Sequence, residues 1–154
     1  MKRTILFPTR LFLAYSRLSR GMTLGVRAAV LDAEDRVLLV RHSYVPGWYL
    51  PGGGVEAGEA TQAALDRELI EEGGIALTGP ARLFGLYWNA RASPRDHVAL
   101  YVCRHWQQAE PPPRTLEIVD SGFFARKSLP DETTAATRRR LAEIAGEMDI
   151  ATEW

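Results

Sequence analysis

Three closely spaced glutamates, Glu68, Glu71 and Glu72, are the residues of this 154-residue chain best placed to do chemistry. A helix is predicted over residues 61–72, because the pair Gly73-Gly74 is a typical helix end. With about 100° of rotation per residue, the three carboxylates fall within an arc of roughly 100°. They would therefore share one face of the helix and could act on the same ligand.

This carboxylate face is electrostatically unfavourable unless something balances it. Neighbouring like charges on a helix repel by a few tenths of a kcal/mol per pair, and the helix C-terminus disfavours anions. Arg67 can pair with Glu71 at i+4, but one guanidinium cannot balance three carboxylates. Mg²⁺ prefers oxygen ligands and keeps waters and phosphates in its shell. We therefore predict a Mg²⁺ site, with Mn²⁺ as a substitute; the alternative is a solvated acidic helix face.

The glutamates belong to a longer spaced pattern of fixed residues. Its positions are Gly53, Glu59, Arg67, Glu68, Leu69, Glu71, Glu72, Gly74 and Ile75. This pattern resembles the Nudix box, the signature of the Nudix hydrolase family, and every fixed position is filled. The resemblance extends over about residues 22–130, including residues 37–41 and 48–56. It implies an α/β/α sandwich with a mixed β-sheet and metal-dependent hydrolysis of a nucleoside diphosphate linked to a further group.

The resemblance also assigns roles to residues of the box. By position, Glu68, Glu71 and Glu72 match the family's metal ligands. Glu68 could instead be the general base, oriented by Arg67. Glu59 is expected to support the site by hydrogen bonding, and the loop that contains Gly53 either positions the helix or offers backbone amides to phosphates.

A second candidate for the general base lies late in the chain. In several family members, a glutamate on a late loop activates the water molecule. Glu117, which precedes Phe123-Phe124, is the candidate here, and Glu110 and Asp120 compete with it. Loops often carry catalytic groups, although a lone late carboxylate is usually only solvated.

The sequence leaves the substrate open between a nucleotide sugar such as ADP-ribose and a nucleoside triphosphate. Candidate contacts are aromatic rings that could stack on a base and arginines that could hold phosphates. The rings are equally compatible with a place in the core. The candidates are Trp48, Tyr87 and Trp88, with Arg27, Arg41, Arg91 and Arg95.

Composition favours a small enzyme acting on a small molecule. The charges balance at 19 basic and 19 acidic residues, and the sequence pI of about 6.8 argues against binding to a nucleic acid polymer. The single cysteine, Cys103, is predicted to be a packed thiol. One cysteine allows no internal disulfide, which favours a reducing, cytoplasmic setting.

The first 20 residues form a separate region before a single domain at residues 21–154. Residues 9–19 are predicted to form an amphipathic helix that packs on the domain or on a second subunit in a homodimer. No apolar run is long enough to span a bilayer. A membrane-surface role for this helix is the alternative. Packing is preferred to it, so stable membrane association is not expected.

The remaining pattern indicates an α/β fold with helices on both faces of a mixed sheet. In the box helix, Leu65, Leu69 and Ile70 are expected to face the core. Residues 24–31 and 36–42 are predicted to pair as a hairpin. Further strands are expected at residues 48–50, 75–77, 82–88, 96–106 and 118–125, and a closing helix at 134–147.

A binding module is the competing functional class, since a Nudix-like domain can also sense nucleotides without catalysis. Such domains typically lose carboxylates of the box. This sequence keeps all of them, which favours an enzyme.

Overall fold

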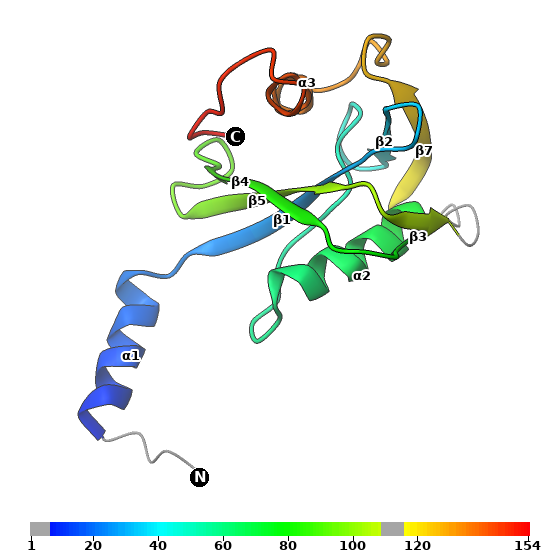
Figure 1. Cartoon of the computed structure of the whole chain (residues 1–154). Coiled ribbons are helices and arrows are strands. Elements are labelled where there is room, and N and C mark those ends of the chain that lie inside the picture. The colour runs from blue at the N-terminus through cyan, green and yellow to red at the C-terminus, as the bar shows by residue number, and fades with distance from the viewer. Residues whose placement is uncertain (1–6, 109–115) are drawn as a thin grey trace.

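The computed structural model describes residues 7–108 and 116–154 (Figure 1). Glu110, one of the candidates for the general base, lies outside these ranges. The elements in chain order are α1 (Phe7–Ser19), β1 (Thr23–Val30), β2 (Arg36–His42), α2 (Thr61–Gly73), β3 (Ile75–Leu77), β4 (Arg82–Trp88), β5 (Asp96–Cys103), β6 (Trp106–Gln108), β7 (Ile118–Ala125) and α3 (Ala135–Ile144).

The central sheet has the strand order β1-β5-β4. β1 and β5 run parallel, from Thr23 opposite Asp96 to Val30 opposite Cys103, whereas β4 and β5 are antiparallel. The parallel and antiparallel pairs confirm the predicted mixed sheet. β4 pairs on one side only among the described strands, so it forms an edge of this sheet.

The predicted hairpin between the first two strands forms only at its turn, where Asp32 N–H bonds to the Arg36 carbonyl, and the strands themselves do not pair. β2 pairs with β7, and only an isolated bridge between Leu31 and Val37 connects the ends of β1 and β2. The turn between them is held by the Asp32 carboxylate, which accepts the backbone N–H groups of Glu34 and Arg36. Apolar runs indicate that strands exist, but they do not say which distant strand is the partner.

Helices cover the strands from both sides, with α2 on one side and α3 on the other (Figure 1). One core lies beneath α2 and includes Val26, Leu65 and Cys103. The other includes Leu39, Leu100 and Leu141 of α3. The α/β/α sandwich is thus confirmed. Burial raises the pKa of the Cys103 thiol to about 12, which fits its predicted role as a packed residue.

The box helix α2 ends as its sequence predicts. Gly74 adopts a left-handed conformation with φ 62°, and its N–H bonds back to the carbonyls of Ile70 and Leu69. Ile70, however, is 57% exposed, so its predicted place in the core is wrong. The helix is rotated so that Glu68 and Glu72 lie on the buried side with Leu65 and Leu69.

Two other boundaries differ from the sequence pattern. The predicted strand over residues 96–106 ends at Cys103, and β6 starts separately at Trp106 to pair with β3. The closing helix α3 is shorter than predicted. It begins after Thr134, whose side chain accepts the Thr137 N–H as an N-cap.

The N-terminal helix α1 forms over Phe7–Ser19, but it does not pack on its own domain. It extends away from the layers (Figure 1), and between Thr9 and Arg20 every residue except Ser16 is exposed. The predicted packing on a second subunit stays a prediction. Across residues 7–108 and 116–154, no helix is long and apolar enough to cross a membrane.

Candidate active site

The two central carboxylates of the box are buried against the glycine loop. Glu68 and Glu72 are 9% and 7% exposed. Glu72 Oε2 accepts the backbone N–H of Gly52 at 2.8 Å. The Glu68 carboxylate lies over the α-carbon of Gly53, where an added β-carbon would be 2.7 Å from Oε2 and closer still to Oε1. Position 53 therefore has room for glycine alone while Glu68 stays in place.

Arg67 connects the box glutamates on the solvent side of this pair. Its Nε and Nη2 donate to the two carboxylate oxygens of Glu59 at 3.1 and 3.0 Å, and its Nη1 donates to Glu68 Oε1 at 2.5 Å. The hydrogen bond from Arg67 is the main cause that lowers the pKa of Glu59, although burial opposes it. Glu71 lies 3.8 Å from Arg67, as the i+4 spacing predicts, and is largely exposed. Arg67 thus positions Glu59 and Glu68.

The buried position of Glu72 disfavours its ionised form. Burial is the main cause that raises its pKa, to about 7, and the charges of Glu68 and Glu117 raise it further. The Gly52 N–H and the Arg27 guanidinium oppose this shift. An additional cation beside Glu72 would favour its ionised form.

In donor chemistry the box fits a hard divalent cation, because it offers carboxylate oxygens near backbone carbonyls. Within residues 7–108 and 116–154, no three His, Cys, Asp or Glu side chains are gathered closely enough to hold an ion as they stand. Glu68 is held by Arg67, whereas the exposed Glu71 has room to turn. Shared coordination therefore requires a side-chain rearrangement, for which Glu71 is the best placed.

His42 is a neighbour of the site that the sequence patterns missed. Its Nε2 lies 3.7 Å from Glu72 Oε1, and its buried Nδ1 has no hydrogen-bond partner among the described residues. Burial is the main cause that lowers the pKa of His42, followed by the charge of Arg27, while Glu117 opposes them. The only sequence signal was a polar residue at the end of the apolar run of β2.

Glu117 comes to the same site from the opposite end of the chain. Its backbone carbonyl accepts the Ser43 N–H at 2.9 Å, and its Oε1 lies 3.4 Å from the Tyr44 hydroxyl. Its charge raises the pKa of Glu72, which places the two carboxylates within electrostatic reach of each other. Asp120, the competing candidate, accepts the N–H of its own neighbour Ser121 and is exposed.

A hollow of about 540 Å³ adjoins the glycine loop. Arg27 lies in its wall and donates from Nη1 to the carbonyls of Leu50 and Gly52, at 3.2 and 2.6 Å. The hollow is lined by Met22, Thr23, Leu24, Gly25, Arg27, Gly53, Gly54, Val55, Glu56, Ala57, Asn89, Asp96, Val98 and Trp154. Since Gly53 also supports Glu68, the hollow and the carboxylates share one wall.

One end of the hollow is polar and already organised by hydrogen bonds. Asp96 accepts Thr23 Oγ1 at 2.6 Å and Asn89 Nδ2 at 2.8 Å. Trp154 lies beside it, tied through its backbone N–H to the Trp88 carbonyl. Sequence patterns did not indicate Trp154, because nothing local distinguishes a terminal tryptophan that returns to the sheet.

Two of the predicted stacking residues lie elsewhere. Trp48 and Tyr87 are buried in the core on the α3 side, where Trp48 packs edge-on against Phe124 and the Tyr87 hydroxyl donates to Glu143. Neither ring lines the hollow, and their contact with substrate stays a prediction. Trp88 is partly exposed and donates to the Pro94 carbonyl.

The predicted phosphate-binding residue Arg41 also lies away from the hollow. It is exposed, and its guanidinium lies 3.7 Å from the Glu132 carboxylate. Arg27 occupies the wall of the hollow instead. A substrate contact by Arg41 stays a prediction.

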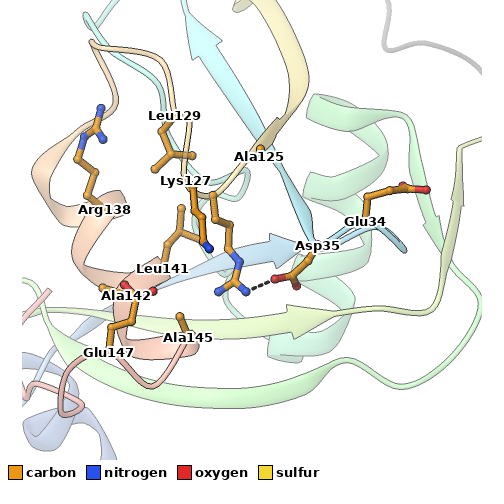
Figure 2. Close-up of a pocket in the computed structure, with 11 residues that line it drawn as sticks. Glu34, Asp35, Ala125, Lys127, Leu129, Arg138, Leu141, Ala142, Ala145 and Glu147 are labelled. Atoms are coloured by element: carbon orange, nitrogen blue, oxygen red, sulfur yellow. Dashed lines mark hydrogen bonds and ion pairs between the residues drawn. The ribbon is translucent and has the colours of Figure 1, made fainter.

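A second hollow, of about 420 Å³, lies between α3 and the end of β7. Figure 2 shows Asp35, Lys127 and Arg138 around it, and Asp35 forms an ion pair with Arg126. No glutamate of the box lines this second hollow. It is therefore separate from the carboxylate site.

Comparisons with known proteins agree with this geometry. The NUDIX domain model matches residues 21–144. A putative 8-oxo-dGTP diphosphatase from Bacillus subtilis is 36% identical over 76 residues, which are 49% of this chain and 50% of that protein. An RNA pyrophosphohydrolase from Histophilus somni is 29% identical over 62% of this chain and 41% of its own length. The chain spans about half the length of these curated relatives.

Solved structures share the fold. A MutT NUDIX hydrolase from Burkholderia pseudomallei is 29% identical, with a TM-score of 0.67 over 79% of this chain and 97% of that one. An ADP-ribose pyrophosphatase from Streptococcus suis is 26% identical, with a TM-score of 0.64 over 83% and 94%. The family match covers the sheet, the glycine loop and the carboxylate helix together, and this chain belongs to the NUDIX domain family.

Proposed function

We propose that this protein hydrolyses a phosphoanhydride bond in a small nucleoside diphosphate derivative, using a divalent cation held by Glu68, Glu71 and Glu72. The observation that carries the proposal is the buried pair of like-charged side chains Glu68 and Glu72, which lies beside a hollow of about 540 Å³. That volume lies within the usual range of about 300–1,000 Å³ for small-molecule sites.

Mg²⁺ is the proposed cation, with Mn²⁺ as a substitute. Nudix hydrolases generally use divalent metal ions, and the carboxylate donors here suit a hard cation. Such an ion neutralises phosphate charge and makes a bound water more acidic. Its binding requires Glu72 to be ionised, so metal and proton compete at this carboxylate.

The chain's own residues supply position and proton transfer. Arg67 holds Glu68 and Glu59 on the solvent side, and Gly52 and Gly53 fix the carboxylates from below. Since Glu68 Oε1 is engaged by Arg67, Glu117 is the better candidate to accept the proton of the attacking water. Its position near Glu72 supports this role.

The hollow suggests how a nucleoside could be held. Leu24, Val98 and Trp154 offer apolar surface, while Asn89 and Asp96 form a polar end for a base or ribose. Phosphates directed toward Gly53 would approach both Arg27 and the carboxylate site. Nucleotide sugars such as ADP-ribose and nucleoside triphosphates both fit this description.

The test is a Mg²⁺-dependent screen of nucleoside triphosphates, 8-oxo-dGTP, ADP-ribose, other nucleotide sugars and RNA carrying a 5′-triphosphate. Hydrolysis in ¹⁸O-labelled water then identifies the phosphorus that is attacked. The proposal expects the label in a phosphate product of a small nucleotide. Processing of RNA alone, or label absent from every phosphate product, would contradict it.

A non-catalytic nucleotide sensor is the second candidate, and the same hollow would serve it. It predicts nucleotide binding without turnover in the presence of Mg²⁺ or Mn²⁺. A cytoplasmic setting, proposed from the single buried cysteine, suits either function.

A further inference from the structure

The helix α1 presents an apolar face that no part of its own described domain covers. Leu11, Phe12, Tyr15 and Leu18 fall within an arc of about 120° on the helix and are all exposed, Leu18 by 81%. An isolated helix of 13 residues is marginal in water, since helices below about 12–15 residues rarely hold alone. We therefore expect another surface to cover this apolar face.

A matching uncovered surface lies on the edge strand β4. Leu83 and Leu86 pair with Tyr101 and Ala99, two residues of the core beneath α2, so all four point to the α2 side of the sheet. Leu83 and Leu86 are nevertheless 54% and 59% exposed. The sheet thus extends past α2 and leaves an apolar strip open at its edge.

The outer flank of α2 adds a further exposed apolar side chain. Ile70 and Asp66 are exposed on the side of the helix opposite the carboxylate flank that contacts the glycine loop. Asp66 lies within electrostatic reach of Cys103 of β5, the strand next to β4. We define the α2–β4 surface by Asp66, Ile70, Leu83 and Leu86.

Charge favours a second copy of the chain over a lipid surface as the occupant. Residues 1–20 hold five of the 19 basic residues and none of the 19 acidic ones. The remaining residues, 21–154, therefore carry 14 basic and 19 acidic side chains. A basic helix and an acidic domain on the same chain are complementary between two copies, whereas an anionic membrane would repel the domain.

The lengths of the helix α1 and the strand β4 also agree. A helix of 13 residues is about 20 Å long, and a strand of seven residues spans about 23 Å. We infer that α1 of one copy packs along the α2–β4 surface of a second copy, and the reverse, in a symmetric helix-exchanged dimer. Each copy then covers the other's open sheet edge, while Arg10 and Arg17, on the opposite side of α1, stay in solvent. This arrangement explains both uncovered surfaces with one partner.

Molar mass by light scattering on the full chain tests the association. Wild type is expected to be a dimer of 17.2-kDa chains at micromolar concentration. Leu83→Glu combined with Leu86→Glu, or Leu11→Glu combined with Leu18→Glu, should weaken the dimer by at least a hundredfold. Leu13→Glu, on the other side of α1, and Ile150→Glu, outside the α2–β4 surface, are matched controls that should remain dimeric. Circular dichroism checks that each variant is folded.

Cross-linking distinguishes the possible partners. Leu18→Cys and Leu86→Cys are made in separate chains, where the native Cys103 is buried. A disulfide-linked dimer that forms in the mixture, and in neither variant alone, supports the exchange. A monomeric wild type, no cross-link in the mixture, or a disulfide-linked dimer of Leu18→Cys alone would overturn it. So would a monomer that co-sediments with phosphatidylglycerol vesicles through α1.

Discussion

The two 13-residue helices α1 and α2 break opposite rules of globular packing. α2 buries two charged side chains, Glu68 and Glu72, whereas α1 leaves large apolar side chains in solvent. Buried charges normally need partners, and clustered exposed apolar groups normally mark an interface. We attribute both departures to partners outside the single chain: the proposed cation at α2 and the proposed second copy at α1. In this account α2 serves the reaction and α1 serves the association of two chains.

Substitution of Glu72 is expected to have the largest effect and tests whether the buried carboxylates of α2 serve catalysis. Glu72→Gln should lower turnover by about a thousandfold or more, because several kcal/mol of cation-based stabilisation of the transition state is lost. Folding should not suffer, since the substitution removes one of several repelling anions. Steady-state kinetics and thermal unfolding measure the two effects. Glu147→Gln, at an exposed carboxylate just after α3, is the matched control. An unfolded Glu72→Gln with normal activity in its folded fraction would make Glu72 structural.

A glycine pair tests whether the position of Glu68 matters. An alanine β-carbon at Gly53 would displace the Glu68 carboxylate, whereas a β-carbon at Gly54 meets nothing within 4 Å. Gly53→Ala should reduce turnover by roughly a hundredfold, since misplacement by about 1 Å has effects of this size. Gly54→Ala should stay near wild type. Equal activities for the two variants would argue against a fixed Glu68.

The role of Glu117 can be separated from that of the box. Glu117→Gln should lower turnover by about a hundredfold while leaving metal affinity nearly unchanged, as expected for a general base. Asp120→Asn is the comparison, because that carboxylate already accepts a backbone N–H. If Glu117→Gln turns over at the wild-type rate, the role of base returns to Glu68.

The smallest effect is a pH dependence of stability without metal. The pKa of Glu72 is raised to about 7 in the folded chain, so it favours folding most at low pH, and this contribution is lost as pH rises from about 4.5 through 7. In chelator, lowering the pH from 8 to 6 should stabilise wild type by about 1 kcal/mol more than Glu72→Gln, or about 2–4 °C in Tm. Saturating Mg²⁺ should abolish the difference. Identical pH profiles in chelator would contradict the raised pKa.

Local signals allowed much of α2 and its site to be predicted. The glycine end of the helix and the shared flank of Glu68 and Glu72 follow from spacing along one helix. The exposure of Ile70 did not, because the rotation of a helix depends on what packs beneath it. That rotation is set here by the glycine loop, where only Gly53 admits the Glu68 carboxylate.

Long-range pairing accounts for the remaining errors. The partner of β1 is β5, more than 60 residues later, and no local pattern indicates it. Tyr87 is buried in the core on the α3 side, whereas Trp154 lines the hollow. The sequence around these two aromatic residues does not distinguish the two positions. The predicted amphipathic character of α1 held, but a single sequence could not show that its own domain leaves it uncovered.

The most direct test of the central claim is Mn²⁺ binding followed by electron paramagnetic resonance, with substrate absent. The account predicts that wild type and Glu147→Gln bind Mn²⁺ with the same affinity at pH 8, that Mg²⁺ competes, and that Glu72→Gln binds at least tenfold more weakly. Equal Mn²⁺ affinity in wild type and Glu72→Gln would contradict a cation site on the buried carboxylates of α2.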